Sequence, residues 1–210
     1  MVDNGFMFLA IIDSDKPDAK EIHEVVKSLQ NGAVIIYPTD TGYAMGCALS
    51  SQTATQRVAS IQKRDPRKPF TLVCSNVEMA KQFAKIDEFA EIYFRQLLPG
   101  PYTFILKATK NVEKIQGLER SKVGVRIPRL AVTSTLIKQL GVPLISSTVR
   151  VEGKKTIDPL VIARQHYKQI DGIVDGGTIM PEETSVVDLS EGTAQIIREG
   201  VGPVSFFRTN

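Results

Sequence analysis

Residues 33–50, Ala-Val-Ile-Ile-Tyr-Pro-Thr-Asp-Thr-Gly-Tyr-Ala-Met-Gly-Cys-Ala-Leu-Ser, decide the fold of this chain. The residues from 33 to 37 are all apolar or aromatic, which is typical of a strand buried on both faces. We expect the strand to stop at Pro38, because proline has no N–H with which to continue a central ladder. Residues 43–49 predict a second, short extended segment.

The polar turn Thr39-Asp40-Thr41 that follows has two interpretations. In open α/β sheets, ligands bind just beyond the carboxyl ends of strands, so two hydroxyls and a carboxylate placed there can meet a phosphate, a carboxylate or a metal. In a plain turn, Thr and Asp side chains instead bond their own backbone. The local pattern by itself favours the plain turn.

The composition indicates an ordinary globular protein. Its 210 residues suit one domain, and 42% hydrophobic and 23% charged residues are unexceptional. The net charge of +3 does not demand nucleic acid, although a local basic face remains compatible with it. Cys47 and Cys74 are expected to be buried free thiols in a reducing compartment. His23 and His166 lie far apart, so we expect surface residues and no metal site.

No segment is typical of a signal peptide or a membrane span. The apolar run 6–12 is short and lies between Asp3 and Asp13. No stretch reaches the length that a membrane span requires. We therefore expect a cytoplasmic protein without a membrane partner, with residues 6–12 as its first strand.

Strands and helices alternate early in the chain, whereas strands cluster late. Periodicity and end signals predict helices at 17–30, 52–62, 76–84, 87–97, 131–140 and 158–168. Further strands are expected at 71–74, 102–106, 123–128, 143–145, 173–175, 184–188 and 194–198. Ser75 and Glu78 form a capping-box pair for the helix at 76–84. The order favours a single α/β domain, residues 1–210, built on a twisted mixed β-sheet with flanking helices.

Hydroxyl and basic residues gather at the ends of several predicted strands. Such groups bind phosphates and carboxylates, so they suit an anionic ligand such as a nucleotide. The alternative is that the hydroxyls satisfy strand ends and that the basic loop is merely solvated. An arginine inside a buried strand, as at position 126, needs a partner to offset its desolvation. The candidates are Thr39, Thr41, Arg126, Ser146, Ser147, Thr148, Thr184, Ser185 and Arg198, with Lys63, Arg64, Arg67 and Lys68 in the loop.

Six short motifs occur here in the order in which they occur in the YrdC/YciO family. They are Pro-Thr-Asp-Thr at 38–41, the basic loop at 63–69, Leu-Pro-Gly-Pro-Tyr-Thr at 98–103, Val-Gly-Val-Arg-Ile-Pro at 123–128, Thr-Ser-Val-Val-Asp at 184–188 and Ile-Ile-Arg-Glu-Gly at 196–200. The chain resembles this family over about residues 7–205. The phrases at 70–74, 102–107 and 198–202 are most similar to the YciO branch.

The resemblance implies an α/β twisted sheet with a concave, positively charged surface. Family members of the YrdC type are threonylcarbamoyl-adenylate synthases, which join L-threonine, bicarbonate and ATP and release pyrophosphate for the modification of an adenosine in tRNA. Binding of double-stranded RNA has also been attributed to the family. ATP with Mg²⁺ would be a co-substrate, and neither a tightly bound cofactor nor a protein-held metal is expected.

The resemblance also implies roles for individual residues. Thr39 and Thr41 would line the side that takes threonine or its carbamate. Arg64 and Arg126 would hold phosphates, and Thr148, Ser185 and Arg198 would surround the nucleotide, with Ser146 as a further substrate-binding hydroxyl. Lys63 and Arg64 are the catalytic candidates, because this reaction needs positioning and charge neutralisation rather than a covalent nucleophile.

Two motifs depart from the synthase pattern. In Gln62-Lys63-Arg64 the lysine is shifted by one position, which turns it to the other face of an extended segment. In Thr148-Val149-Arg150 a long cation replaces an asparagine. Both departures keep or add positive charge where a polynucleotide could lie. The alternative function is therefore a non-catalytic YciO-type protein that binds double-stranded RNA or tRNA through Lys63, Arg67, Lys68 and Arg150, or a paralogue acting on another small anion.

Overall fold

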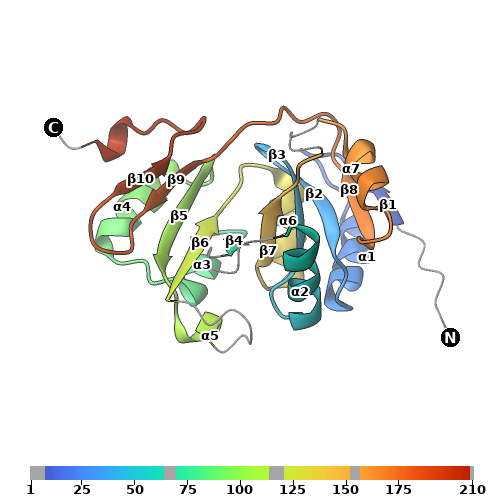
Figure 1. The fold of residues 1–210 in the computed structure, drawn as a ribbon, viewed down its shortest axis with the longest axis horizontal. Helices are drawn as coiled ribbons and strands as arrows, with labels where there is room; N and C mark the ends of the chain where they lie inside the picture. The colour runs from blue at the N-terminus through green and yellow to red at the C-terminus, as the bar shows by residue number, and fades with distance from the viewer. Residues whose placement is uncertain (1–7, 64–69, 114–120, 152–156, 209–210) are drawn as a thin grey trace.

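A mixed β-sheet runs through the whole molecule (Figure 1). The computed structural model describes residues 8–63, 70–113, 121–151 and 157–208. Within these residues the sheet has ten strands in the order β1-β8-β2-β3-β7-β4-β6-β5-β9-β10. The strands are β1 (Phe8–Ile11), β2 (Ile35–Thr39), β3 (Gly42–Ala48), β4 (Thr71–Val73), β5 (Tyr102–Lys107), β6 (Lys122–Arg126), β7 (Leu144–Thr148), β8 (Gly172–Asp175), β9 (Ser185–Asp188) and β10 (Gln195–Arg198).

Helices flank the sheet, as the alternation of elements predicts. They are α1 (Ala19–Gln30), α2 (Gln52–Ile61), α3 (Val77–Phe83), α4 (Glu88–Leu97), α5 (Lys110–Glu113), α6 (Ala131–Leu140) and α7 (Pro159–His166), with a 3₁₀ turn at Ser205–Phe207. In Figure 1, α3 and α4 lie beside the β5 end of the sheet, and α1, α2, α6 and α7 lie beside the β8 end. No helix of the described segments is both long and apolar enough to cross a membrane.

The predicted end of β2 is wrong, because the strand continues through Pro38 to Thr39. Pro38 lies within the strand, opposite Tyr43 of β3. On the other side of β2, the neighbouring strand β8 pairs only with Ile35 and Ile36. Pro38 therefore stands beyond that ladder, where a missing N–H costs no strand pairing. The predicted extended segment at 43–49 is β3.

The start of α7 and the end of α6 follow the sequence signals, whereas the start of α3 does not. Asp158 accepts from the backbone N–H of Leu160 and opens α7, and Gly141 ends α6 with a left-handed φ of 78°. The capping box predicted from Ser75 and Glu78 is wrong. Asn76 caps α3 instead, because its side chain accepts from the Met79 N–H at 2.8 Å.

Burial confirms the prediction for the cysteines and corrects one histidine. Cys47 and Cys74 are buried and free, and burial raises their pKa to about 11 and about 12. His23 is exposed, but His166 is buried, with Nδ1 3.0 Å from Gln169 Oε1. Its spacing from Ile162 places it on the inner face of α7, where apolar neighbours decide its environment.

Helices cover only part of one sheet face. Side chains alternate between faces along a strand, so Thr71 and Val73 of β4 share a face, as do Ser146 and Leu144 of β7. Val73 and Leu144 lie in the apolar cluster that includes α1 and α6. Thr71 and Ser146, which stand opposite each other in the ladder, line an open cleft instead. The cleft is therefore the uncovered continuation of the face on which α1 and α6 pack.

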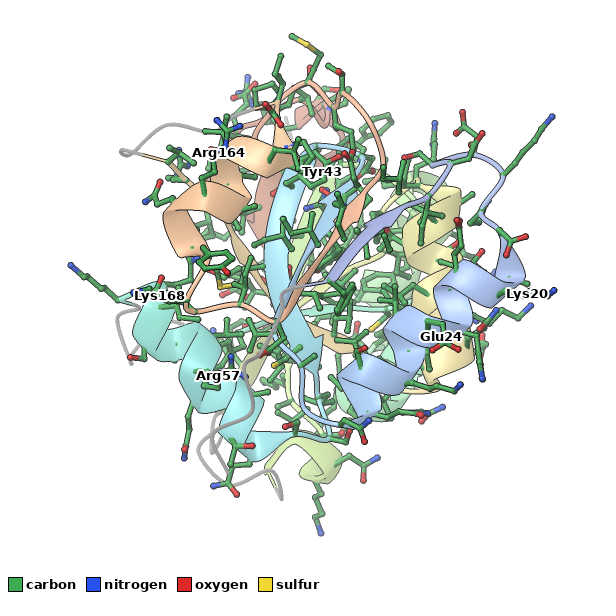
Figure 2. The ribbon with its side chains drawn as sticks, turned by 90° about the vertical axis from the view of Figure 1, so that its right-hand side faces the viewer. Lys20, Glu24, Tyr43, Arg57, Arg164 and Lys168 are labelled. Atoms are coloured by element: carbon green, nitrogen blue, oxygen red, sulfur yellow. The ribbon has the colours of Figure 1, made fainter. Side chains whose placement is uncertain are left out.

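A connecting segment passes over one end of the sheet. Residues 176–184, which we call the crossover segment, link β8 to β9 along the upper rim in Figure 1. The Glu182 N–H donates to Thr41 O at 3.2 Å. The Tyr43 hydroxyl donates to Gly177 O at 2.6 Å, and Figure 2 shows Tyr43 within the body while Lys20 and Glu24 project outward from α1. The crossover segment is thus tied to the β2–β3 turn.

Candidate active site

The open part of the sheet face forms a cavity of about 510 Å³. Residues from β2–β3, β4, β5, β6, β7, β9 and β10 contribute to it, so distant parts of the chain meet there. Most of the lining side chains are hydroxyls, arginines or small residues. They are Thr39, Thr41, Gly42, Tyr43, Ala44, Thr71, Thr103, Ile105, Gly124, Arg126, Ser146, Ser147, Thr148, Arg150, Thr184, Val186, Ile197 and Arg198.

Arg126 joins the polar turn at one end of the cleft. Its Nη2 donates to Thr41 Oγ1 at 2.7 Å and to Thr39 Oγ1 at 3.2 Å, and it forms an ion pair with Asp40. The arginine side chain is only 10% exposed, so it is a largely desolvated cation. The expectation that an arginine in this strand needs a partner is confirmed, and the partner is Asp40.

Asp40 fixes the position of this cluster, yet one donor in it has no acceptor. The second carboxylate oxygen of Asp40 accepts from the Arg129 N–H at 2.9 Å. Arg126 Nε is buried and has no hydrogen-bond partner among the described residues. A buried donor without an acceptor is costly. Because Arg126 also lines the cleft, the rest of its guanidinium can meet an anionic group there.

The polar turn has the hydrogen bonds of a plain turn and also lines the cleft. Asp40 and Thr41 are the two residues between β2 and β3, and Gly42 follows with a φ of 114°. The Thr39 hydroxyl donates to Gly42 O at 2.6 Å and accepts from the Thr41 N–H at 3.3 Å, which is plain turn chemistry. The same turn also presents both threonine hydroxyls to Arg126 and to the cleft.

Hydroxyls from β7 line the middle of the cleft. The Tyr37 hydroxyl donates to Ser146 Oγ at 2.7 Å. Full burial raises the pKa of Tyr37 to about 12, so it stays a proton donor at neutral pH. Ser146 Oγ is thus held in place from behind, while Thr148 stands exposed further along the same wall. Gly46 allows this packing, since a Cβ there would lie 2.8 Å from the Tyr37 ring.

Two arginines, Arg150 and Arg198, and the carboxylate of Glu183 occupy the other end of the cleft. Arg198 Nε donates to Thr184 O at 2.9 Å and Nη2 donates to Thr184 Oγ1 at 2.8 Å. Its Nη1 lies 2.9 Å from Glu183 Oε2. Arg150 Nη2 donates to the other oxygen, Glu183 Oε1, at 2.6 Å. Glu183 therefore stands between two guanidinium groups.

An apolar surface adjoins these charges. Ile105, Val186 and Ile197 come from the neighbouring strands β5, β9 and β10 and line the cleft together. Ile197 is 52% exposed, so its side chain is open to a ligand in the cleft. Apolar side chains beside arginines suit a ligand with a flat ring and a charged group.

The structure brings most of the predicted site residues together and separates two from the cleft. Thr39, Thr41, Arg126, Ser146, Thr148, Arg150 and Arg198 all line it. Ser185 is fully buried and is not a lining residue, because its hydroxyl donates to Gly202 O at 2.5 Å and accepts from the Gly200 N–H at 2.9 Å. Its neighbour Thr184 lines the cleft instead. Lys63 is exposed after the end of α2 and is not a lining residue either.

Three predicted cations, Arg64, Arg67 and Lys68, lie outside the described residues. Of the four cations predicted to bind RNA, only Lys63 and Arg150 are therefore placed, and Arg150 is paired with Glu183. RNA binding stays a prediction. No group of three or more His, Cys, Asp or Glu residues in the described segments is arranged to hold a metal ion.

Two carboxylates of the site form ion pairs with arginines that the sequence analysis did not assign to them. Asp40 stands between the two candidate threonines, and the need of Arg126 for a partner is a signal that points to it. Glu183 directly precedes the Thr184-Ser185 motif. Nothing in the sequence relates it to Arg150, which lies 33 residues earlier.

Comparisons with known proteins place the chain in a family. The family model Sua5/YciO/YrdC, described as "Telomere recombination", matches residues 27–200. "Uncharacterized protein YciO" of Escherichia coli (strain K12) is 34% identical in an alignment of 199 residues that covers 93% of this chain and 97% of that protein. "Threonylcarbamoyl-AMP synthase" of Xanthomonas axonopodis pv. citri (strain 306) is 30% identical in an alignment of 192 residues that covers 87% of this chain and 99% of that protein.

Solved structures give the same result. The crystal structure of E. coli YciO has a TM-score of 0.90 and 33% identity, and the match covers 97% of this chain and 100% of that one. P. abyssi Sua5, complexed with L-threonine, has a TM-score of 0.83 and 25% identity, and the match covers 92% of this chain but 58% of that one. The fold is thus the single mixed α/β domain of these proteins, and the chain belongs to the Sua5/YciO/YrdC family.

Proposed function

We propose that this protein binds L-threonine and ATP in the cleft and joins them, with bicarbonate, to form threonylcarbamoyl-AMP. The observation that carries the proposal is Arg126, a largely desolvated guanidinium that lines the cleft beside the hydroxyls of Thr39 and Thr41. The relatives named threonylcarbamoyl-AMP synthase and the Sua5 structure with L-threonine support the choice of ligand.

The amino acid occupies the Arg126 end in this proposal. A carboxylate can accept from the Arg126 guanidinium where it lines the cleft, and small hydroxyls nearby can bond the remaining polar atoms of threonine. The structure links Arg126 to the polar turn rather than to Arg198. For this reason we assign Arg126 to the carboxylate of threonine, rather than to the phosphates as the sequence resemblance implied.

The nucleotide occupies the Arg198 end. The adenosine lies against Ile105, Val186 and Ile197, and the phosphates approach Arg198 and Arg150. Mg²⁺ would enter with ATP, because this ion prefers phosphate oxygens and water to a cage made by protein alone. Lys63 and Arg64 remain proposed as further phosphate ligands.

The chemistry then needs two anions to meet. Threonine and bicarbonate give a carbamate and water, and a carbamate oxygen attacks the α-phosphorus. The bond to the β,γ-phosphates breaks, and pyrophosphate leaves. The arginines and hydroxyls contribute by positioning the reactants and neutralising charge, and no covalent nucleophile takes part.

Calorimetric titration with L-threonine and with ATP, separately and together, tests the proposal. We expect both to bind and pyrophosphate to be released when bicarbonate and Mg²⁺ are present. Arg126→Lys should weaken threonine binding about tenfold or more, because lysine keeps the charge but not the planar donor fork. Arg129→Lys is the matched control, since the exposed Arg129 side chain donates to Pro99 O away from the cleft. Absence of binding by both ligands, with no pyrophosphate release, would refute the proposal.

A further inference from the structure

The carboxylate of Glu183 holds two arginines that both line the cleft. Arg150 Nη2 is 2.6 Å from one oxygen and Arg198 Nη1 is 2.9 Å from the other. The side chain of Arg150 is 46% exposed, that of Arg198 is 42% exposed and that of Glu183 is 33% exposed. The ion pairs are thus open to solvent and to any ligand that enters.

The three residues come from separate parts of the fold. Arg150 follows β7, and Arg198 ends β10. Glu183 belongs to the crossover segment, whose backbone is also held by the Glu182 N–H to Thr41 O and by the Val201 N–H to Glu183 O at 3.0 Å. The two ion pairs therefore join the β7 wall of the cleft to the β10 wall through this segment.

The arrangement around Glu183 matches what a phosphate group needs. Two guanidinium groups offer N–H donors to two oxygens of one anion, a geometry that serves phosphate as well as carboxylate. Partly exposed ion pairs are weak, so Glu183 can be displaced by a more highly charged anion. Arg198 keeps its orientation meanwhile, because Thr184 holds its Nε and Nη2.

We propose that Arg150 and Arg198 form a phosphate clamp in which Glu183 is a resident competing anion. A polyphosphate group binds by displacing Glu183, and this displacement releases the crossover segment from the Arg150 wall. Glu183 thus sets the affinity of the clamp and couples phosphate binding to the rim of the cleft. The proposal rests on the proposed nucleotide binding for its natural ligand, but the clamp itself is tested with inorganic pyrophosphate.

Glu183→Gln removes the competing charge while keeping the size of the side chain. We expect pyrophosphate to bind this variant about fivefold more tightly than the wild type, in line with the modest strength of exposed ion pairs. Glu199→Gln is the matched control, because Glu199 pairs with Arg208 at 2.7 Å and does not line the cleft. That control should bind pyrophosphate as the wild type does.

Amide hydrogen exchange supplies a second readout, because a purely structural Glu183 would not make the Glu182 amide respond to pyrophosphate. In the wild type, pyrophosphate should speed exchange of the Glu182 amide, whereas in Glu183→Gln the amide should exchange fast already. Equal or weaker pyrophosphate binding by Glu183→Gln, or no pyrophosphate binding by either protein, overturns the clamp proposal. ATP and threonine binding that persists in that case leaves the proposed function standing, so the two failures are distinguishable.

Discussion

Arg126 shows how one residue organises a site. It lies in a central strand with a side chain that is only 10% exposed, and its charge is offset by Asp40 and two threonine hydroxyls. Asp40 in turn bonds the Arg129 backbone, so the carboxylate is held from both sides. The largely buried Arg126–Asp40 pair therefore has a structural role in the wall of the cleft.

We predict that Asp40→Asn destabilises the protein by roughly 2–4 kcal/mol, because it leaves the largely buried Arg126 guanidinium without its counter-charge. Urea unfolding followed by circular dichroism measures the change. Glu24→Gln is the control, since it breaks an exposed pair with Lys27 and should change stability little. Equal effects of the two substitutions would contradict the structural role of Asp40.

The β2–β3 hairpin and α6 are the elements that position Asp40 and its neighbouring threonines. The polar turn directly follows β2, and α6 is hydrogen-bonded to the end of β2. The Thr133 hydroxyl donates to Pro38 O at 2.6 Å, and both Thr133 and the end of β2 are buried. One side-chain hydrogen bond thus connects the helix that covers the sheet face to the strand end that opens into the cleft.

For these elements we predict that Thr133→Val costs about 1–3 kcal/mol of unfolding free energy. Valine keeps the shape of threonine but leaves the Pro38 carbonyl without this partner in a buried place. Thr135→Val, at a partly exposed position of the same helix, is the control and should cost less. Matching urea midpoints for the two variants would argue against an anchoring role for Thr133.

Over the whole molecule, the sheet separates an apolar interior from an open face. Both cysteines are fully buried on the side that α2, α3, α4 and α7 cover. Burial raises the pKa of Cys47 to about 11 and of Cys74 to about 12, from an ordinary value of 9.0. The folded protein therefore keeps its thiol protons at a pH where the unfolded chain has lost them.

The sign of the pH effect follows from these pKa values. Because the unfolded state binds fewer protons above pH 9, stability is fully present below that pH and falls as the pH rises towards 11 and 12. Each thiol should cost about 1.4 kcal/mol of stability between pH 8 and pH 10. Urea unfolding at the two pH values should show a smaller fall for Cys74→Ala than for the wild type. An identical fall in both proteins would mean that Cys74 is not protected by burial.

Much of the fold could be predicted from local sequence. The helices at 131–140 and 158–168 carry clear signals. Gly141 ends the first and Asp158 caps the start of the second, and both act through backbone groups a few residues away. The buried strand β2 is likewise evident from its apolar run. Two predictions were wrong, the end of β2 before Pro38 and the exposure of His166. Both depend on which strand or helix lies alongside, and local patterns contain no such information.

By itself the sequence determined most of the elements, the apolar strands, the hydroxyl and arginine residues at their ends, and the family resemblance. These properties depend on side-chain type and on spacing within short segments. Only the tertiary structure decided that Asp40 partners Arg126, that Glu183 stands between Arg150 and Arg198, and that Ser185 is turned away from the cleft. The physical reason is that these contacts join residues brought together by sheet order, and an ion pair forms wherever opposite charges meet in space, whatever their separation along the chain.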